Sequence, residues 1–273
     1  MNHLDPYGYL IPEIFPGGFS PEYQAIYDAF ITKPPDAVAE NQDQMVRGMI
    51  ADGDWQTKDI FYVTAAQSAA DSLINWINPG THDLTVVNLL AGAFTVNRGW
   101  TGNGVNGYLN TNYNPNTDGV NYLQDDASIG CYIRTNVLAE NMYDIGTYDG
   151  ANASFLKTNN NDRIYTAIND INLANFVAGN IDSRGFYITS RLLAANFNVY
   201  KNKIVTNFVE NSTGIPSFNF YIFSINNSGA PLTYSTKQVS AAFAGGGMTQ
   251  VNVNNFTDRL ETFLDSIGAG VIP

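Results

Sequence analysis

From residue 81 onward, apolar and polar residues alternate with a period of two, the pattern of β-strands. The clearest run is 128–134, where Ile129, Cys131 and Ile133 share one face and the residues between them share the other. We expect this run to be a half-buried antiparallel strand. The other strands predicted from the pattern are 84–88, 93–97, 107–111, 143–148, 153–158, 163–169, 185–192, 197–200, 204–209, 218–225 and 238–244. Many short strands, separated by turns such as Asp149-Gly150, predict a β-sandwich or a β-barrel.

Both ends of the chain carry a helical pattern instead. Ser20-Pro21 supplies an N-cap and a first-turn proline, Gly53 stands after a second apolar stripe, and Gly268 follows the last one. Apolar residues recur at helical spacing in each of these segments. The predicted helices are 20–31, 36–53, 66–77 and 249–267.

Residues 1–19 have too many prolines for a helix and too many large apolar residues for a solvated tail. We expect this segment to be an extended arm that packs either on its own domain or on a partner. The residues predicted to form this assembly interface are Tyr7, Tyr9, Leu10, Ile11, Ile14 and Phe15.

Several segments of the strand region also resemble one family. They are 98–104 (RGWTGNG), 108–111 (YLNT), Asn114-Pro115, 184–187 (RGFY), 199–203 (VYKNK), Tyr234-Ser235 and Phe243-Ala244-Gly245. Over residues 85–267 the chain resembles the concanavalin A-like, laminin-G-like jelly-roll virion proteins of tailed bacteriophages. The resemblance implies a mainly β, concanavalin A-like sandwich with an N-terminal helical segment and a C-terminal helix. The expected organisation is an arm and helical docking segment at 1–80, the sandwich at 81–248, and a helix packed on the same unit at 249–273.

Charge and composition limit the kinds of partner that this protein is expected to bind. The net charge is −12, and residues 1–80 hold 11 acidic but only 3 basic side chains. Without a cluster of Lys or Arg, we expect no nucleic-acid partner. The sequence has no charged segment followed by an apolar core after Met1, and no apolar run near ~20 residues, so we expect neither a secretory signal nor a membrane span. The single Cys131 cannot form an intrachain disulfide and is predicted to be a small buried apolar residue.

Candidates for catalysis are few. His3 and His82 are the only histidines, and neither lies in a nucleophile, metal-ligand or cofactor motif. Two carboxylates can hydrolyse a glycosidic bond, but Asp125 and Asp126 are adjacent and would point to opposite faces of a strand. We therefore predict no catalytic residues, no cofactor and no metal. Calcium binding through Asp118, Asp125, Asp126, Asp144 and Asp149 stays open, because carboxylates are its preferred ligands.

Aromatic residues in Gly- and Asn-rich turns indicate the function better than the candidate catalytic residues do. Lectin-like sites stack sugars on aromatic rings and bind their hydroxyls with Asn and Asp. The predicted ligand-binding residues are Trp100, Tyr108, Asn112, Tyr113, Tyr122 and Tyr148. The same rings can instead cap the ends of the sandwich.

The sequence thus favours a non-enzymatic bacteriophage virion protein, such as a head or tail fibre, spike or decoration component. It would be located on the virion with other virion proteins as partners, as a homo-oligomer, with a trimer favoured. A carbohydrate-binding adsorption protein that contacts a host glycan is the alternative, and a polysaccharide hydrolase or lyase is the third reading.

Overall fold

The computed structural model describes residues 18–138 and 140–273. The predicted interface residues of the arm, Tyr7 to Phe15, lie outside the described residues. No helix within the described part of the chain is both long and apolar enough to cross a membrane.

Two of the N-terminal helices form as predicted. Helix α1 (Pro21–Ala29) begins after the Ser20 cap, whose hydroxyl accepts the Tyr23 backbone N–H. Helix α2 (Asp36–Ala51) is followed by Gly53 at a φ of 78°. The residue types at the helix ends therefore set these boundaries.

The third predicted helix, 66–77, is wrong. Residues 66–77 contain only a 3₁₀ turn, η2 (Asp71–Leu73). Before them, where neither helix nor strand was predicted, a 3₁₀ turn η1 (Trp55–Thr57) leads into strand β1 (Lys58–Val63). The apolar residues of 66–77 divide between two cores: Ile74 packs on the helix side of the first sheet, and Leu73 packs between the sheets. A segment that serves two cores cannot present one helical stripe.

The first sheet has eight strands, seven of them in the order β13-β12-β11-β6-β17-β4-β3, with β1 paired to β17. Strand β1 lies between two predicted helices and β4 lies within 98–104, and neither was among the predicted strands. The strand bounds, in sheet order, are β13 (Ile204–Phe208), β12 (Asn196–Lys201), β11 (Gly185–Leu193), β6 (Ala127–Ile133), β17 (Gln238–Gly245), β4 (Gly99–Thr101) and β3 (Phe94–Thr95).

The second sheet has nine strands and faces the first. Its path is β10 (Phe176–Ala178), β9 (Arg163–Asp170), β8 (Ala153–Lys157), β7 (Ile145–Tyr148), β14 (Tyr221–Ile222), β5 (Tyr108–Asn110) and β2 (Thr85–Val87). Strand β15 (Ser224–Asn227) pairs with β7 and with β16 (Ala230–Tyr234). The predicted strand 218–225 is divided because Phe223 has a φ of 71°. A turn η3 (Ala91–Ala93) precedes β3.

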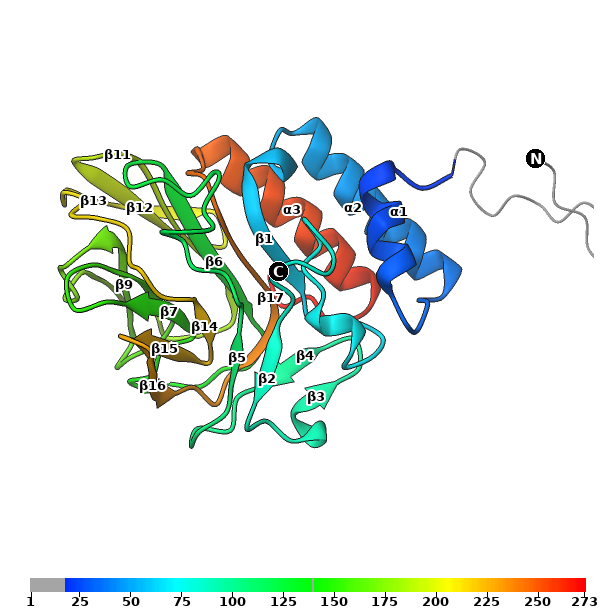
Figure 1. Ribbon diagram of the computed structural model, residues 1–273, viewed down its shortest axis with the longest axis horizontal. Coiled ribbons are helices and arrows are strands. Elements are labelled where there is room, and N and C mark those ends of the chain that lie inside the picture. The colour runs from blue at the N-terminus through cyan, green and yellow to red at the C-terminus, as the bar shows by residue number, and fades with distance from the viewer. Residues whose placement is uncertain (1–17, 139) are drawn as a thin grey trace, which may run out of the picture.

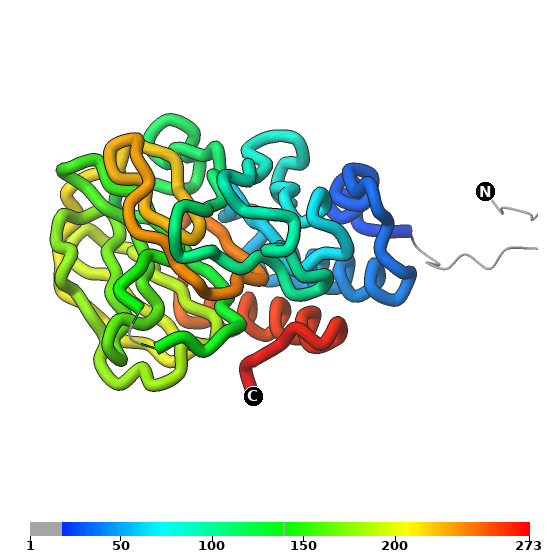
Figure 2. The backbone as a smooth tube through the Cα atoms, turned by 90° about the horizontal axis from the view of Figure 1, so that it is seen from below, coloured from blue at the N-terminus to red at the C-terminus, as the bar shows by residue number. Residues whose placement is uncertain are grey.

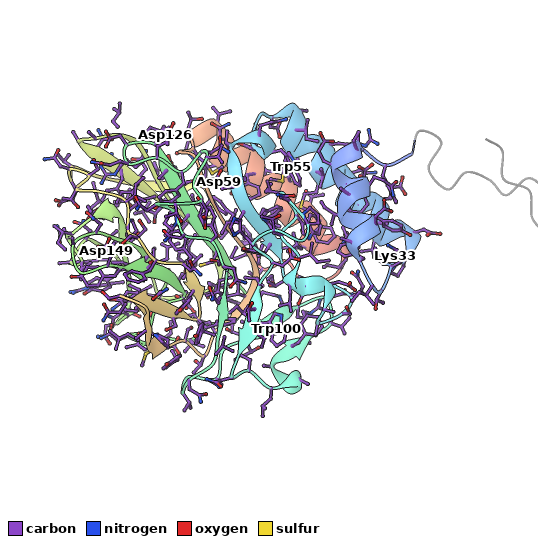
Figure 3. The ribbon with its side chains drawn as sticks, viewed as in Figure 1. Lys33, Trp55, Asp59, Trp100, Asp126 and Asp149 are labelled. Carbon is purple, nitrogen blue, oxygen red and sulfur yellow. The ribbon has the colours of Figure 1, made fainter. Side chains whose placement is uncertain are left out.

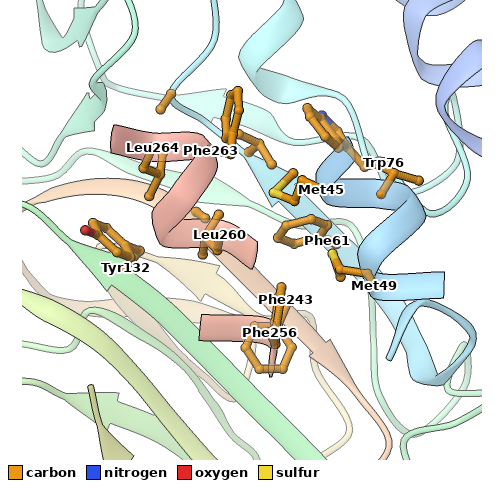
Figure 4. Packing of buried hydrophobic residues seen from close by; sticks show 14 of the residues in the cluster. Met45, Met49, Phe61, Trp76, Tyr132, Phe243, Phe256, Leu260, Phe263 and Leu264 are labelled. Carbon is orange, nitrogen blue, oxygen red and sulfur yellow. The ribbon is translucent and has the colours of Figure 1, made fainter. Parts of the chain in front are cut away.

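Helices cover the outer face of the first sheet, so the molecule has three layers (Figure 1). Helix α3 (Gln250–Ser266) starts at a capping box built on Thr249, and Gly268 follows it at a φ of 67°. Figure 2 shows this helix and the C-terminal residues along one border of the molecule. Phe256 of α3 contacts Phe61, Phe186 and Phe243, with ring centroids 5.4, 5.3 and 5.1 Å away (Figure 4).

The central strand β6 is buried on both faces, which corrects the prediction of a half-buried strand. Ile129, Cys131 and Ile133 do share one face, and they belong to the core between the sheets. Tyr132 on the opposite face belongs to the core under the helices. The helical layer therefore buries the face that a two-layer sandwich would leave in water. As predicted, Cys131 is a buried residue. Overall, the mainly β sandwich with helices at both ends is confirmed.

Candidate functional site

Three of the predicted ligand-binding rings are part of the core. Trp100 is 3% exposed, Tyr113 0% and Tyr122 1%. The Trp100 indole donates to Ser72 Oγ at 2.8 Å, and the Tyr122 hydroxyl lies 2.7 Å from Ser154 Oγ. Their ring faces are not open to a ligand, so these rings hold the ends of the sandwich together instead.

The other three predicted residues lie apart from one another. Tyr108 and Tyr148 stand on the outer face of the second sheet, away from the inter-sheet core. Tyr108 packs on Tyr221 with ring centroids 4.3 Å apart, and the Tyr148 hydroxyl donates to Gly150 O. Asn112 has a φ of 55°, and its amide donates to Asp83 O at 2.7 Å, so it shapes a loop. The structure therefore does not bring the six predicted residues into one site.

A hollow of about 480 Å³ lies where three segments meet at the start of β1. We call it the polar cleft. Of the predicted residues only Tyr113 lines it. Figure 3 shows Trp55 and Asp59 together at this end of β1, with Trp100 well away from them. The lining residues are Trp55, Gln56, Lys58, Asp59, Asn75, Ile77, Asn78, Thr81, His82, Tyr113, Asp118, Val120 and Asn121.

Asp59 fixes one wall of the polar cleft. It stands at an irregularity in β1, between Lys58 and Ile60, where the register with β17 shifts. Its carboxylate accepts the Tyr113 hydroxyl at 2.7 Å and the Asn121 amide at 2.9 Å. It also accepts the backbone N–H groups of residues 120–122. A carboxylate with this many donors holds a loop in one conformation and keeps its charge compensated.

Asn75 and Asp83 fix the opposite wall. The Asn75 side chain accepts the Phe61 N–H at 3.1 Å and donates to Thr81 O at 3.0 Å. Asp83 accepts the backbone N–H groups of Asn75 at 2.8 Å and Gly80 at 3.2 Å. The wall 75–82 is thereby tied to β1, although its sequence is a turn of Asn, Pro and Gly.

His82 lines the polar cleft. Its Nδ1 lies 2.6 Å from the Asn112 carbonyl oxygen. A carbonyl oxygen only accepts, so Nδ1 carries the proton of this hydrogen bond. The ring stands edge-to-face on Tyr113, with centroids 5.5 Å apart. The sequence around His82 contains no motif that marks it as a site residue, because its partners come from a distant loop.

The rim of the polar cleft offers uncharged polar groups. Gln56, Asn78 and Thr81 are exposed there, and their side chains make no hydrogen bond to residues 18–138 or 140–273. Trp55 and Ile77 supply its apolar part. Such a mixture suits a ligand with hydroxyl groups and apolar patches.

The charges in the polar cleft are carboxylates. Asp118 accepts the Asn114 N–H at 2.9 Å and the Thr117 hydroxyl at 3.0 Å, so it also holds a loop. The Lys58 side chain turns away into the helix-side core, over the rings of Phe243 and Phe256. No positive side chain other than Lys58 lines this hollow among the described residues.

The carboxylates considered for calcium lie apart. Asp144 is buried against Lys237 at 3.2 Å, Asp126 accepts the Gly247 N–H, and Asp149 accepts the N–H groups of its own turn. Asp125 accepts the Ser212 hydroxyl. Within residues 18–138 and 140–273, no three His, Cys, Asp or Glu side chains are placed to share a metal ion.

Comparisons with known proteins bear on the fold alone. No family model and no curated protein matches the sequence. Among solved structures, a mutant of Trypanosoma rangeli sialidase displaying trans-sialidase activity is similar over 86% of this chain and 40% of its own, with a TM-score of 0.51 and 14% identity. The receptor binding domain of botulinum neurotoxin D is similar over 75% of this chain and 53% of its own, with a TM-score of 0.51 and 10% identity. This chain thus spans about half or less of these two structures.

Proposed function

We propose that this protein is a non-enzymatic, lectin-like binding protein that recognises a carbohydrate in the polar cleft. The observation that carries the proposal is the composition of this hollow. Gln56, Asn78 and Thr81 offer free hydrogen-bonding groups on its rim, and Trp55 and Ile77 give it an apolar side. Sugars present hydroxyl groups around apolar ring faces, so they need both kinds of contact.

The walls of the polar cleft support binding without a large rearrangement. Asp59 and Asn75 fix the two loops from opposite sides, so their positions are set before any ligand arrives. A preformed site loses less entropy when the ligand binds. Asp59 therefore has a positioning role, and the residues of the rim contact the sugar.

The absence of catalysis is part of the proposal. Glycoside hydrolysis by two carboxylates needs one that exchanges a proton and one that attacks or activates water. Asp59 and Asp118 are the carboxylates of this hollow, and both are engaged by loop donors. The fold does not decide between the two activities, because its neighbours include a sialidase as well as a receptor-binding domain.

The proposal extends to the setting in which binding takes place. The sequence resemblance to jelly-roll virion proteins of tailed bacteriophages supports a virion component that contacts other virion proteins and a host-surface glycan. Mass spectrometry of purified phage particles tests this part, and the expected result is a defined copy number of the protein. Particles that lack the protein would contradict the virion setting and leave carbohydrate binding to be judged separately.

A glycan array followed by titration calorimetry tests the binding function. We expect wild-type protein to bind at least one oligosaccharide and Asn78→Ala to weaken that binding about 5-fold, the effect of losing one hydrogen bond of ~1 kcal/mol. Asn116→Ala is the matched control, because Asn116 is exposed on a loop and does not line the polar cleft. Release of reducing sugar from the bound glycan would contradict the non-enzymatic assignment.

A further inference from the structure

A lysine and two carboxylates form a buried cluster where the two sheets meet. Asp144 directly precedes β7 of the second sheet, and Lys237 directly precedes β17 of the first. The Lys237 Nζ lies 2.9 Å from Glu140 Oε2, and 3.2 and 3.3 Å from the two carboxyl oxygens of Asp144. The side chains of Lys237 and Asp144 are 0% exposed, and that of Glu140 is 9% exposed. Water therefore reaches little of this cluster.

No other lysine in the described part of the chain is placed like Lys237. Lys203 forms an ion pair with Asp258, but both side chains are exposed. Lys58 is buried, but its ammonium group donates to a backbone carbonyl and a hydroxyl. Lys237 alone combines burial with two carboxylates. One ammonium ion between two carboxylates leaves a net negative charge in the protein interior, which is costly.

The Nζ atom of Lys237 is positioned as a nucleophile against Asp144. Because Nζ is nearly equidistant from both carboxyl oxygens, it faces the carboxyl carbon between them. Thr158 donates its N–H and its hydroxyl to Oδ2, and Ser235 donates its hydroxyl to Oδ1, each at 2.7 Å, so the carboxyl group is held in this orientation. A nucleophile held against its target needs no encounter from solution. The same donors can stabilise the negative charge of a tetrahedral intermediate.

Glu140 is placed to move protons. Its Oε2 contacts Nζ, and its Oε1 accepts the N–H and the hydroxyl of Thr236 at 2.7 Å each, so this carboxylate is fixed beside the lysine. Burial opposes the ammonium charge of Lys237, but Asp144 and Glu140 outweigh burial and raise its pKa. The nitrogen is therefore an ammonium ion at rest and must lose a proton before it can attack. A carboxylate in contact with the nitrogen can serve as the general base for this step.

We propose that Lys237 and Asp144 condense to an amide, an isopeptide bond that joins the two sheets, with Glu140 as the catalytic residue. Glu140 takes a proton from the ammonium group and passes it to Asp144, which gives a neutral amine and a neutral carboxyl group. The lone pair of Nζ then forms a bond to the carboxyl carbon. Glu140 moves a second proton from the nitrogen to the hydroxyl group of the intermediate, the C–O bond breaks, and one water molecule leaves. Glu140 ends as a carboxylate, as it began.

The isopeptide bond removes two of the three buried charges, because a neutral amide replaces the ammonium ion and one carboxylate. Its two partners stand 93 positions apart in the chain, so the bond also restricts the unfolded state. The buried pair of Arg191 and Asp170 cannot react in this way, because a guanidinium group stays charged and is not a nucleophile.

Mass spectrometry of the purified full chain tests the proposal. The wild-type protein should be lighter by one water than the mass calculated from its sequence. Lys237→Arg keeps the positive charge but cannot form the amide, so it should have its full calculated mass. Lys203→Arg is the matched control, because Lys203 is the lysine of the exposed ion pair, and it should lose one water as the wild type does.

Tryptic digestion locates the bond. Trypsin cleaves after Lys and Arg but not after an amidated lysine, so wild-type protein should release residues 135–157 joined to residues 204–259. Glu140→Gln removes the proton carrier and should slow the condensation about 100-fold, measured as the gain of the joined peptide with time. A wild-type protein of full calculated mass would overturn the proposal. So would a loss of water that persists in Lys237→Arg, and condensation of Glu140→Gln at the wild-type rate would refute the role of Glu140.

Discussion

At the scale of single residues, the carboxyl groups of Asp59 and Asp170 lie in different environments. Asp59 is compensated by the Tyr113 hydroxyl, the Asn121 amide and three backbone N–H groups, so its charge organises a loop. Asp170 is buried beside Arg191, whose Nη2 lies 3.6 Å away, and burial raises the pKa of Asp170 to about 6. Burial thus favours the neutral form of the Asp170 carboxyl.

Removing the Asp59 carboxylate should destabilise the protein and open the polar cleft. Asp59→Ala leaves the N–H groups of 120–122 and the Tyr113 hydroxyl without their acceptor. Hydrogen bonds to a charged group contribute about 1.5–3 kcal/mol each, so we expect a loss of about 2–4 kcal/mol after partial rescue by water. Urea denaturation measures it. Asp125→Ala, which removes an exposed carboxylate that accepts from Ser212, should cost under about 1 kcal/mol. Equal losses in the two variants would refute the role given to Asp59.

The raised pKa of Asp170 predicts how stability changes with pH. Because the folded pKa is about 6 and the ordinary value 3.8, the folded state binds the proton more tightly. The contribution of Asp170 is therefore full below about pH 4 and is lost as the pH rises through 6. Over that interval the loss is roughly 2–3 kcal/mol.

Asp170→Asn should remove this component. We expect the wild type to become less stable relative to the variant as the pH rises. Urea denaturation at pH 4, 5, 6 and 7 measures this difference. Asp182→Asn is the control, because the Arg184 guanidinium holds the pKa of Asp182 below its usual range. Its effect should have the opposite sign. A pH-independent difference for Asp170→Asn would contradict the assignment.

At the scale of elements, α3 and β1 turn a two-layer sandwich into three layers. Phe256 of α3 is fully buried among rings of β1, β11 and β17. Phe256→Ala should therefore reduce the free energy of unfolding by about 3–5 kcal/mol. Val251→Ala on the exposed side of the same helix should change it by under about 0.5 kcal/mol. Denaturant unfolding of both variants provides the comparison, and a mild effect of Phe256→Ala would show that α3 is only loosely attached.

The sequence predicts elements well where local signals act alone. Ser20, Gly53 and Gly268 mark helix ends correctly, and alternation predicts β6, β8, β9, β11 and β17. It misses β1, which is apolar on both faces and so lacks the alternation of a half-buried strand. It also wrongly predicts a helix at 66–77, whose apolar residues serve two cores. It also fails at Phe223, whose positive φ is imposed by tertiary structure.

At the scale of the whole molecule, the failure to predict strand β1 also explains why the candidate site could not be predicted from the sequence. The polar cleft joins residues 55–59 with 75–82 and 113–121, and these segments meet only once β1 is placed in the first sheet. Tyr113 lines this hollow although its ring is buried, whereas Trp100 and Tyr122 are buried rings away from it. Rings in Gly- and Asn-rich turns look alike in sequence whether they face a ligand or close the end of a sandwich.

The central claim, that a carbohydrate binds in the polar cleft, is tested most directly by the indole NMR signals of the three tryptophans. Trp55 lines the polar cleft, whereas Trp76 lies under the helices and Trp100 between the sheets. Titrating ¹⁵N-labelled protein with the oligosaccharide selected on the array should shift the Trp55 signal in proportion to occupancy and leave the other two unchanged. Binding that leaves Trp55 unmoved while perturbing the face of Tyr108 and Tyr148 would contradict the account.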